Sequence, residues 1–432
     1  MNRPVLTLLF LGITSSCWSL SVGDLQSLID RAPRGATVQI PSGIYQGELI
    51  VGHPVLLRAL PGAKLVHSPG TAGPTLWIKS SDVEVDGLEI VGSGEGTRRD
   101  HTAILVSGSR VQLTGLRIEK AWSGVWLERC GDVTIRDLAV TGLRDFPFWE
   151  RGEGVRVTEG TNIRLQNLQL ASVSDGIYAE RSANLTVSDC SVVDARYGLH
   201  LMFSDGGEAS QIRTSQTVAG VMVMESSQWV IRDSHLVDGY RTGSAGVREI
   251  RTKNVSVLRT EVARQASGIE LLDVRAGLFE GNRIAENGIA WTWGGDNSGT
   301  MVQDNSHLGN LMDFAGDEPS EKVLLAVEAQ DHMAMAGRMG TPSAQDLAPT
   351  VTETSLHMRP QFDRNSWDAW GGTDLDHDGI GDTPYRFDSV SAARAASRPW
   401  AGVFLGSPWS QWSRGIPGGE VIDEHPRTKS VR

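Results

Sequence analysis

The sequence predicts an all-β fold, a right-handed parallel β-helix with rungs of about 22 residues. The first observation is a recurring segment, Gly-apolar-any-apolar, whose copies are 30, 22, 22, 22, 26 and 22 residues apart. The second is another strand signature that lies between these copies. The third is the lack of room for crossover helices, which a doubly wound fold needs between its parallel strands. The Gly segments begin at Gly124, Gly154, Gly176, Gly198, Gly220, Gly246 and Gly268.

The second strand signature alternates apolar and polar residues, as strands with one buried face do. A Gly, Asn or Asp stands at the bends, where the chain has to turn sharply. Leucine-rich repeats have a similar period, but their fixed leucines and asparagine do not match this consensus. The Gly246 copy is a weaker member, because Glu249 stands where an apolar residue is expected. The second signature occurs at Val85–Ile90, Leu113–Ile118, Ile135–Val140, Leu165–Leu170, Val187–Val192 and Phe279–Ile284.

The composition indicates a large folded protein and disfavours nucleic-acid binding. Of the 432 residues, 40% are hydrophobic and 21% are charged, which is enough to bury a large core. The formal net charge is −12. Proteins that bind nucleic acid through a basic face carry the opposite sign, so we expect no nucleic-acid partner.

Residues 1–21 have the pattern of a Sec-type export signal. A short basic start precedes the apolar run Val5–Ile13, which is too short to span a bilayer, and small residues near Ser19 or Ser21 offer cleavage sites. We therefore expect a soluble, exported protein. After cleavage, Cys130 and Cys190 remain, and the sequence leaves open whether they are bridged.

After the signal, the helical spacing of Val22–Arg31 predicts a helix that caps the first rung. The predicted β-helix covers residues 22–310. An irregular, Met-containing segment follows at 311–360, and a C-terminal tail at 361–432. Within the irregular segment, His332–Met339 is either an entry site for a soft metal or a packing surface.

Insertions longer than the period always precede a Gly strand, at 92–101, 142–153 and 239–245. They therefore crowd one edge of the predicted solenoid, and loops grafted on a rigid repeat often carry function. The aromatic stretch Leu143–Trp149 either contacts a partner or buries its own rings.

Two Gly segments 22 residues apart predict a patch of soft metal ligands. Gly198-Leu-His-Leu-Met202 and Gly220-Val-Met-Val-Met224 alternate in the same way, so their His and Met side chains share one face. Imidazole and thioether together favour Cu(I) over hard ions such as Mg²⁺. The alternative is that these side chains only cover a hydrophobic strip under a loop or partner. The candidate copper ligands are His200, Met202, Met222 and Met224.

An acidic loop in the tail predicts a structural calcium site. From Asp374 onward, Asp residues occupy relative positions 1, 3, 5 and 9 with Gly at position 6, which resembles an EF-hand loop. Tyr385 replaces the bidentate Glu at position 12, so a full EF-hand is excluded. The alternative is a solvated acidic turn. The candidate ligands are the side chains of Asp374, Asp376, Asp378 and Asp382 and the carbonyl of Ile380.

A carbohydrate-active protein, such as a polysaccharide lyase, epimerase or hydrolase, is the alternative function. Glu128 and Glu180 occupy the same outward column two rungs apart, which corresponds to about 9.6 Å. A carboxylate pair at a defined separation suits glycosidic chemistry. The Met residues nearby make a poor floor for a hydrated sugar, so we favour the metal interpretation.

The strand motifs resemble a known family. Gly198-Leu-His-Leu-Met-Phe-Ser-Asp205, followed by Gly220–Met224, is similar to the paired strand motif of the NosD family. Asn365–Asp368, the block Asp374–Tyr385 and Ser407-Pro-Trp409 resemble the tail of the same family. Among the departures from the family pattern is Glu225, where an aromatic residue would be typical.

This resemblance implies a periplasmic β-helix protein that takes part in nitrous-oxide-reductase maturation and is not itself an enzyme. Its implied partners are an ABC-type permease and ATPase, with nitrous oxide reductase as client and a copper chaperone as a further candidate. The implied role is copper delivery or client docking. The family pattern carries over to His200, Met202 and Met224, whereas Met222 fits the patch by spacing alone.

Overall fold

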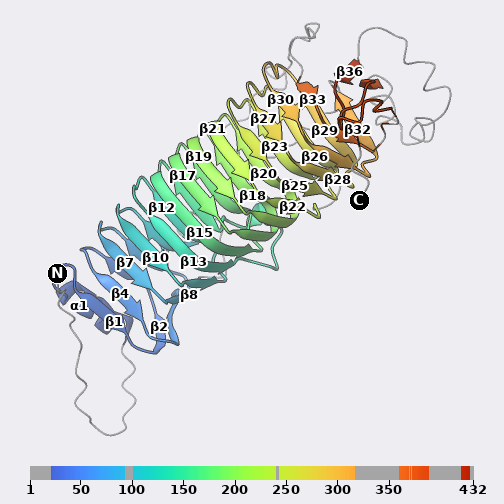
Figure 1. The fold of residues 1–432 in the computed structure, drawn as a ribbon. Coiled ribbons are helices and arrows are strands. Elements are labelled where there is room, and N and C mark those ends of the chain that lie inside the picture. Colours follow the sequence, from blue (N-terminus) through green and yellow to red (C-terminus); the bar gives the residue numbers. More distant parts are fainter. Residues whose placement is uncertain are drawn as a thin grey trace, which may run out of the picture. The chain divides into compact units, whose positions relative to one another are not determined.

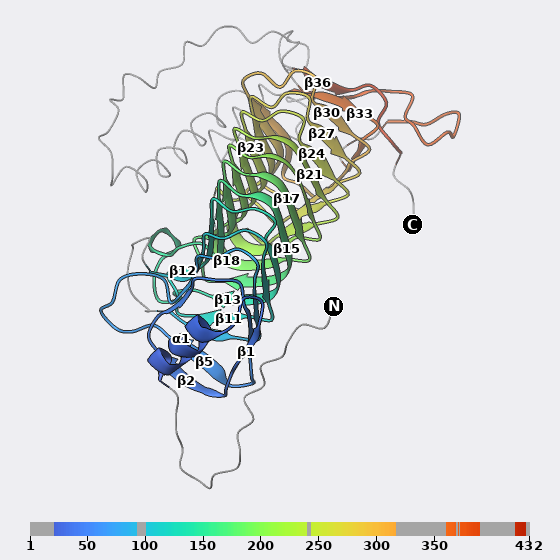
Figure 2. The same ribbon diagram turned by 90° about the vertical axis from the view of Figure 1, so that its left-hand side faces the viewer.

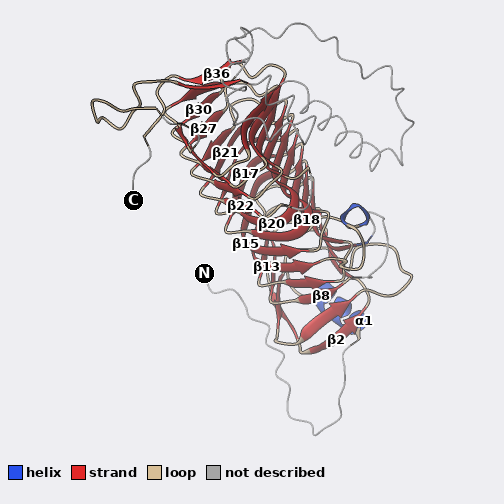
Figure 3. Ribbon diagram, turned by 90° about the vertical axis from the view of Figure 1, so that its right-hand side faces the viewer, coloured by secondary structure: helices blue, strands red, loops and turns tan. Residues whose placement is uncertain are grey.

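The chain folds into two compact units, Met1–Thr217 and Val218–Arg432, called unit 1 and unit 2 below. Parallel strands are the main regular elements in the described parts of both units, and Figure 3 draws the strands as red arrows. The predicted all-β, parallel β-helix fold is thereby confirmed. Within the described parts of the chain, we find no helix of the length and hydropathy that a membrane span requires. The computed structural model describes residues 21–92, 101–239, 243–316, 360–368, 370, 372–388 and 420–428.

Unit 1 stacks its strands in three parallel ladders (blue to green in Figure 1). Its elements are α1 (Val22–Arg31), β1 (Thr37–Ile40), β2 (Gly43–Gln46), β3 (Leu49–Val51), β4 (Leu56–Ala59), β5 (Ala63–Val66), β6 (Leu76–Ile78), β7 (Val83–Asp86), β8 (Glu89–Val91), β9 (Thr102–Val106), β10 (Val111–Thr114), β11 (Arg117–Glu119), β12 (Ser123–Glu128), β13 (Thr134–Thr141), η2 (Phe148–Glu150), β14 (Val155–Thr158), β15 (Thr161–Ala171), β16 (Asp175–Glu180), β17 (Ala183–Ser188), β18 (Ser191–Met202) and β19 (Asp205–Ser210). The predicted Gly segments fall in the third ladder, which contains β3, β6, β9, β12, β14, β16 and the second half of β18.

Unit 2 repeats this arrangement (Figure 1). Strand β20 (Arg213–Met224) begins in unit 1 and continues into unit 2. The other strands of unit 2 are β21 (Ser227–Arg232), β22 (His235–Val237), β23 (Ala245–Ile250), β24 (Ser256–Leu258), β25 (Glu261–Ala263), β26 (Ser267–Leu272), β27 (Leu278–Glu280), β28 (Arg283–Ala285), β29 (Ile289–Gly294), β30 (Met301–Gln303), β31 (Ser306–Leu308), β32 (Met312–Gly316), β33 (Gln361–Asp363), β34 (Ser366–Trp367), β35 (Tyr385–Asp388) and β36 (Glu420–Asp423). Parallel pairing continues beyond residue 310, because β33 and β34 pair with β30 and β31.

The repeat needs glycine at the start of each Gly strand because neighbouring rungs approach closely there. A Cβ atom on Gly124 would lie 2.4 Å from the carbonyl oxygen of Gly154. The corresponding distance is 2.7 Å from Gly154 to Gly176 and 2.5 Å from Gly176 to Gly198. Any side chain would therefore push adjacent rungs apart, which explains the most regular feature of the sequence.

The bends use the left-handed backbone conformation, which Asn and Asp tolerate better than most residues. At one corner of unit 1, Asp137, Asn167 and Asp189 stack with φ of 54°, 54° and 56°. Asn167 also donates a hydrogen bond from its amide to Asp137 at 2.6 Å. The Asn and Asp residues predicted at the bends thus shape the corners and also link successive rungs.

Helix α1 caps the first rung of unit 1, as predicted (Figure 2). Ser21 and Asp24 form a capping box at its start. The helix buries Leu25 and packs against β1 and β3. The Gln26 amide donates to the carbonyl of Ile50 and accepts from its N–H, each at 2.8 Å. The helix therefore covers the core and also satisfies polar groups on the exposed edge of β3.

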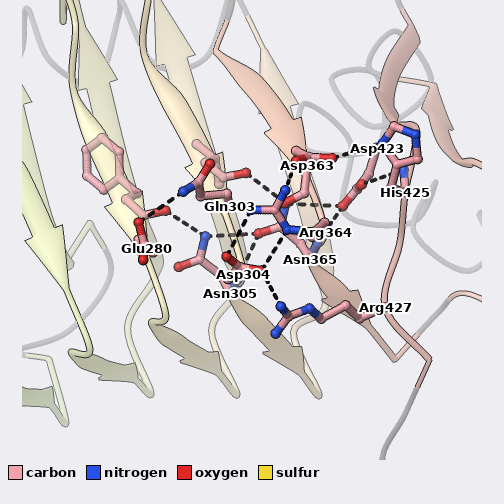
Figure 4. Close-up of polar contacts among 12 residues, drawn as sticks. Glu280, Gln303, Asp304, Asn305, Asp363, Arg364, Asn365, Asp423, His425 and Arg427 are labelled. Atoms are coloured by element: carbon pink, nitrogen blue, oxygen red, sulfur yellow. Dashed lines mark hydrogen bonds and ion pairs between the residues drawn. The ribbon is translucent and has the colours of Figure 1, made fainter. Parts of the chain in front are cut away.

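A ladder of buried amides closes the C-terminal end of unit 2 (Figure 4). Asn282 donates to Asn305 and Asn305 to Asn365, both at 2.9 Å, and Asn365 donates to Asp423 at 3.1 Å. All are nearly or fully buried. Asp423 lies on β36, which pairs with β33 and β35, so the tail returns to satisfy the last rung. Ion pairs flank the ladder: Arg364 with Asp304 and Asp363, Arg427 with Asp304, and His425 with Asp363.

Cys130 and Cys190 are both free thiols and both buried. Burial raises the pKa of each thiol to about 12, so neither is a ready thiolate. The open question of a bridge between them is thereby answered. The predicted signal at 1–21 and the piece His332–Met339 lie outside the described residues, apart from residue 21.

Candidate metal centre

Strand β18 places His200 and Met202 on the outward face of the third ladder of unit 1. Leu199 and Leu201 point inward and are fully buried, as the alternation of a strand requires. The register sets His200 beside Tyr178 of β16, which agrees with the 22-residue interval between the segments that begin at Gly176 and Gly198. Although it faces outward, the His200 side chain is only 3% exposed, so protein groups surround it.

A buried carboxylate orients the His200 ring. Its Nδ1 lies 2.9 Å from Oδ2 of Asp175, and Arg196 donates to the same carboxylate at 2.9 and 2.8 Å. Burial alone would raise the pKa of Asp175, but the charge of Arg196 and hydrogen bonds from His200 and Arg196 hold this pKa well below its ordinary value. Asp175 is therefore an anion that only accepts, and Nδ1 of His200 is the nitrogen that carries the proton.

The other nitrogen of His200, Nε2, is buried and has no hydrogen-bond partner among the residues that the structure describes. The rings of Tyr178 and Tyr197 lie 4.8 and 4.9 Å from the His200 ring, measured between centroids. The Tyr178 hydroxyl donates to the sulfur of Met202 at 3.6 Å. Tyr178 thus contacts both the imidazole of His200 and the thioether of Met202. Nε2 of His200 is the ring nitrogen that remains for a soft metal.

Met222 and Met224 lie in unit 2, on the outward face of β20. Met222 is fully buried and Met224 is 8% exposed, and the register sets Met222 beside Arg248 of β23. His200 and Met202 therefore share one face of β18 in unit 1, and Met222 and Met224 share one face of β20 in unit 2. A single site that joins all of them stays a prediction.

Sequence reasoning missed Asp175, Arg196 and Tyr197. A signal for Asp175 was present, because this acid directly precedes the repeat glycine Gly176, one rung before the strand of His200. The parallel register sets Asp175 opposite Tyr197, three residues before His200 on the next Gly strand, and the side chains bridge the remaining separation. Arg196 carries no comparable signal, since surface-type arginines are common on these strands.

The carboxylates of the alternative sugar site are engaged in ion pairs. Glu180 lies 3.3 Å from the guanidinium of Arg156 and 2.8 Å from that of Arg181. Glu128 lies 3.7 Å from Arg129. A glycosidase needs one carboxylic acid that donates a proton and one free carboxylate. Glu180 at least is committed to cations of the protein instead.

The aromatic insertion of unit 1 is firmly held and yet presents tryptophan to solvent. Arg151 is 8% exposed and donates to the carbonyl of Phe146 at 2.7 Å and to the carboxylate of Asp194 at 2.9 Å. Asp194 lies on β18, which helix η2 also contacts. Trp149, within η2, is 65% exposed, and Phe146 is 37% exposed. The insertion therefore leaves these two rings available on a rigid loop beside the strand of His200.

The acidic loop of unit 2 gathers part of the predicted calcium ligand set. Carboxylate oxygens of Asp374, Asp376 and Asp382 lie within 4.8 Å of one another. Oδ1 of Asp374 is buried and has no hydrogen-bond partner in the described part of the chain. Asp378 is outside this cluster, and its carboxylate accepts the backbone N–H of Ile380 at 2.7 Å. A cation at the shared point would neutralise three neighbouring carboxylates.

Part of the chain matches the model of a known protein family. The family model described as "Periplasmic copper-binding protein (NosD)" matches residues 139–323, which include His200, Met202, Met222 and Met224. The matched family is thus one of periplasmic, copper-binding proteins. This match confirms the resemblance to the NosD family.

Two curated relatives carry the description "Probable ABC transporter binding protein NosD". The one from Stutzerimonas stutzeri is 26% identical over 140 residues, which cover 32% of this chain and 32% of the relative. The one from Pseudomonas aeruginosa is 24% identical over 175 residues, or 40% of each protein. The chain therefore spans well under half the length of the curated relatives that it matches.

Solved structures support the fold alone. The A-module of a mannuronan C-5 epimerase from Azotobacter vinelandii matches with a TM-score of 0.51 and 14% identity, over 69% of this chain and 94% of the module. The Dettilon tailspike protein matches with a TM-score of 0.52 and 10% identity, over 67% of this chain and 65% of the tailspike chain. At these identities the likeness says nothing of substrate.

Proposed function

We propose that this protein is an exported, non-catalytic accessory protein of an ABC-type transporter, which handles Cu(I) during maturation of the copper sites of nitrous oxide reductase. The observation that carries the proposal is the buried His200, whose Nε2 is uncommitted while its Nδ1 is engaged by Asp175. Copper is the cargo of this site, held for transfer. The match to a family of periplasmic copper-binding proteins and to relatives described as ABC transporter binding proteins supports the same role.

The residues present suit Cu(I). Neutral imidazole and thioether are soft ligands that leave the charge of the monovalent ion largely uncompensated, which favours release to a stronger thiolate or histidine site. Met202 and, from the predicted patch, Met222 and Met224 supply sulfur, and His200 supplies nitrogen. Zinc would instead favour a set with Cys, several His or a carboxylate among its ligands.

Competition with a Cu(I) chelator tests the proposal on the signal-free protein. We expect the variant that combines His200→Ala, Met202→Ala and Met224→Ala to lose competitive Cu(I) binding. The matched control combines His235→Ala and Met301→Ala, which removes a histidine and a methionine elsewhere. A triple variant with wild-type affinity would show that the site lies elsewhere.

Docking on the transporter is the second part of the proposal, and the insertion with Trp149 supports it. Arg151 fixes the loop before any partner arrives, so little conformational entropy is lost when the ring is buried. Exposed tryptophans on rigid loops often dominate interface energies. The contact of η2 with β18 places this loop beside the strand that carries His200, so a docked permease would lie close to the cargo.

A structural calcium ion in the acidic loop is also proposed. The loop is anchored to the end of the tail, because Gly381 donates to the carbonyl of Pro426 at 2.7 Å and Thr428 donates to that of Gly379 at 3.1 Å. An ion held by Asp374, Asp376 and Asp382, with Asp378 and the Ile380 carbonyl as the remaining candidates, would lock this loop onto the strands that close unit 2.

Melting in calcium, magnesium and EDTA tests that site. A ligand that binds only the folded state at a hundredfold excess over Kd adds about 2.7 kcal/mol to stability. Calcium should therefore raise the melting temperature or protect the tail from proteolysis, and magnesium should do less. The gain should vanish in Asp376→Ala combined with Asp378→Ala. Identical curves in EDTA and in millimolar calcium would make the loop a solvated turn.

The absence of glycan turnover is part of the proposal as well. Incubation with alginate, pectate and related acidic glycans should yield neither new reducing ends nor unsaturated products. If the wild type degrades one of these glycans and Glu128→Gln or Glu180→Gln does not, the protein is a carbohydrate-active protein and the proposed accessory role is wrong.

A further inference from the structure

We infer that Asp175, held in place by Arg196, is a positioning residue that fixes His200 in the tautomer with the proton on Nδ1 and so makes Nε2 the metal-binding nitrogen. The inference rests on the proposed copper function and deepens it. It concerns a carboxylate and an arginine that never touch the metal themselves.

The geometry of the carboxylate carries the inference. Oδ1 of Asp175 accepts Nε of Arg196 at 2.9 Å, and Oδ2 accepts Nη2 of the same guanidinium at 2.8 Å, which is a bidentate pair with a fixed plane. Oδ2 also lies 2.9 Å from Nδ1 of His200. A carboxylate fixed in this way only accepts hydrogen bonds at this position, so the imidazole has to donate from Nδ1.

The surrounding rings hold the imidazole in that orientation. Tyr178 packs at 4.8 Å with its plane tilted by 51°, and Tyr197 packs edge-on at 4.9 Å with an interplanar angle of 81°. Arg196 also lies 4.5 Å above the Tyr197 ring, so the same guanidinium supports the carboxylate and one wall. A flip of the imidazole, which would exchange the two nitrogens, is opposed from both sides.

The second ring nitrogen of His200, Nε2, is buried and receives no hydrogen bond from the described residues. His200 is 3% exposed, and Nε2 accepts no hydrogen bond from the residues that the structure describes. Buried polar atoms in folded proteins nearly always have a partner, and a missing one marks a ligand position or a tolerated defect. Metal-bound histidines characteristically donate their other N–H to a carboxylate, which is the arrangement found here.

The alternative is that Asp175 and His200 form a structural pair that neutralises Arg196. That alternative predicts a stability loss when Asp175 is changed, but no dependence of the Cu(I) affinity on the carboxylate. The two accounts therefore differ in what they predict for a folded variant.

The experiment compares the wild type with Asp175→Asn, Asp175→Glu and Arg196→Lys. Nitrogen-15 NMR of the histidine rings in the metal-free protein reports which ring nitrogen of His200 carries the proton, and His200→Gln assigns the signal. Cu(I) affinity is measured against a competing chelator. The matched control is Asp233→Asn. It removes a carboxylate that pairs with Arg259 and Arg232 and that lies between β21 and β22, outside the strand of His200.

We expect the Nδ1–H tautomer in the wild type and a mixture, or the Nε2–H form, in Asp175→Asn. Cu(I) affinity should fall about 10- to 100-fold in that variant, the range typical for loss of a carboxylate behind a ligating histidine. Asp175→Glu, which keeps the carboxylate, should recover part of both readouts, and Arg196→Lys should give a smaller loss. Asp233→Asn should leave both unchanged.

Two results would overturn the inference. One is a wild type whose His200 carries its proton on Nε2. The other is a folded Asp175→Asn, judged by its far-ultraviolet circular dichroism, with unchanged tautomer and unchanged affinity. If Asp175→Asn does not fold, Asp175→Glu and Arg196→Lys decide by the same two readouts. Copper binding that persists in the His200→Ala, Met202→Ala and Met224→Ala variant refutes the proposed function, whereas the tautomer is read without copper.

Discussion

In unit 1 the outward position of β18 holds His200, whereas in unit 2 the equivalent positions of β23 and β26 hold Arg248 and Glu270. All of these side chains are nearly or fully buried. Arg248 donates to Glu270 from Nε and to the carbonyl of Gly243 at 3.2 Å, so the guanidinium and the carboxylate form a buried ion pair. Nδ1 of His200 is hydrogen-bonded to Asp175, whereas Nε2 has no hydrogen-bond partner among the described residues. The same place in the repeat thus holds an ion pair on β23 and β26, whereas on β18 it holds a ring nitrogen without a hydrogen-bond partner among the described residues.

The largest expected effect comes from removing one partner of the Arg248–Glu270 ion pair. Glu270→Gln keeps the shape of the side chain but removes the negative charge that Glu270 sets against the buried Arg248. Loss of one partner of a buried ion pair typically costs about 3–5 kcal/mol, and we expect a loss of that order in urea unfolding.

The control for this experiment is Glu261→Gln. Glu261 is partly exposed and pairs with Arg283 at 2.9 Å, so its loss should cost no more than about 1 kcal/mol. If Glu270→Gln and Glu261→Gln unfold at the same denaturant concentration, the Arg248–Glu270 pair is not the structural element that we describe.

Unit 2 also buries an acid, Glu249, on the inward face of β23. No ion pair with a basic side chain is found for it among the described residues. It is fully buried, accepts only from the Thr252 hydroxyl at 2.8 Å within the described residues, and burial raises its pKa to about 7. A raised folded pKa means that the folded state binds its proton more tightly than the unfolded state does. The contribution is therefore complete below the unfolded pKa near 4.5 and is lost as pH rises through about 7.

Glu249→Gln should remove this dependence on pH. Between pH 4.5 and 8 the wild type should lose on the order of 3 kcal/mol of unfolding free energy through this group, and the variant should lose less. Urea unfolding at several pH values measures it, with Glu286→Gln at an exposed position as control. Parallel pH profiles for wild type and Glu249→Gln would mean that Glu249 is hydrated in solution.

The docking surface of unit 1 should give the smallest effect. Trp149→Ala should weaken binding to the detergent-solubilised transporter by roughly 2 kcal/mol, or about 30-fold, because an exposed tryptophan on a rigid loop is a typical interface anchor. Cu(I) affinity should not change. Ile44→Ala, at another exposed apolar residue of unit 1, is the control. If Trp149→Ala and Ile44→Ala bind the transporter equally well, the loop is not the docking surface.

The fold could be predicted because its determinants repeat in the sequence. The close approach at Gly124, Gly154 and Gly176 forces glycine at fixed intervals, and the register then follows from the period. The outward column that contains Tyr178 and His200 could be read for the same reason.

The candidate site could be predicted only in part, because its environment depends on side-chain packing. Alternation places His200 outward, but it does not reveal that the side chain is buried. The link from Arg196 to Asp175 joins residues on adjacent strands, and its value depends on rotamers that no sequence pattern encodes. The acidic loop shows the same limit, since Asp378 has the expected spacing but does not belong to the cluster that Asp374, Asp376 and Asp382 form.

X-ray absorption of the Cu(I)-loaded protein tests the central claim most directly, because it reports the atoms bound to the metal. The account predicts sulfur scatterers together with one imidazole nitrogen shell. That nitrogen shell should disappear in His200→Ala and persist in His235→Ala. A shell made only of nitrogen and oxygen, or a spectrum that does not change in His200→Ala, would contradict it.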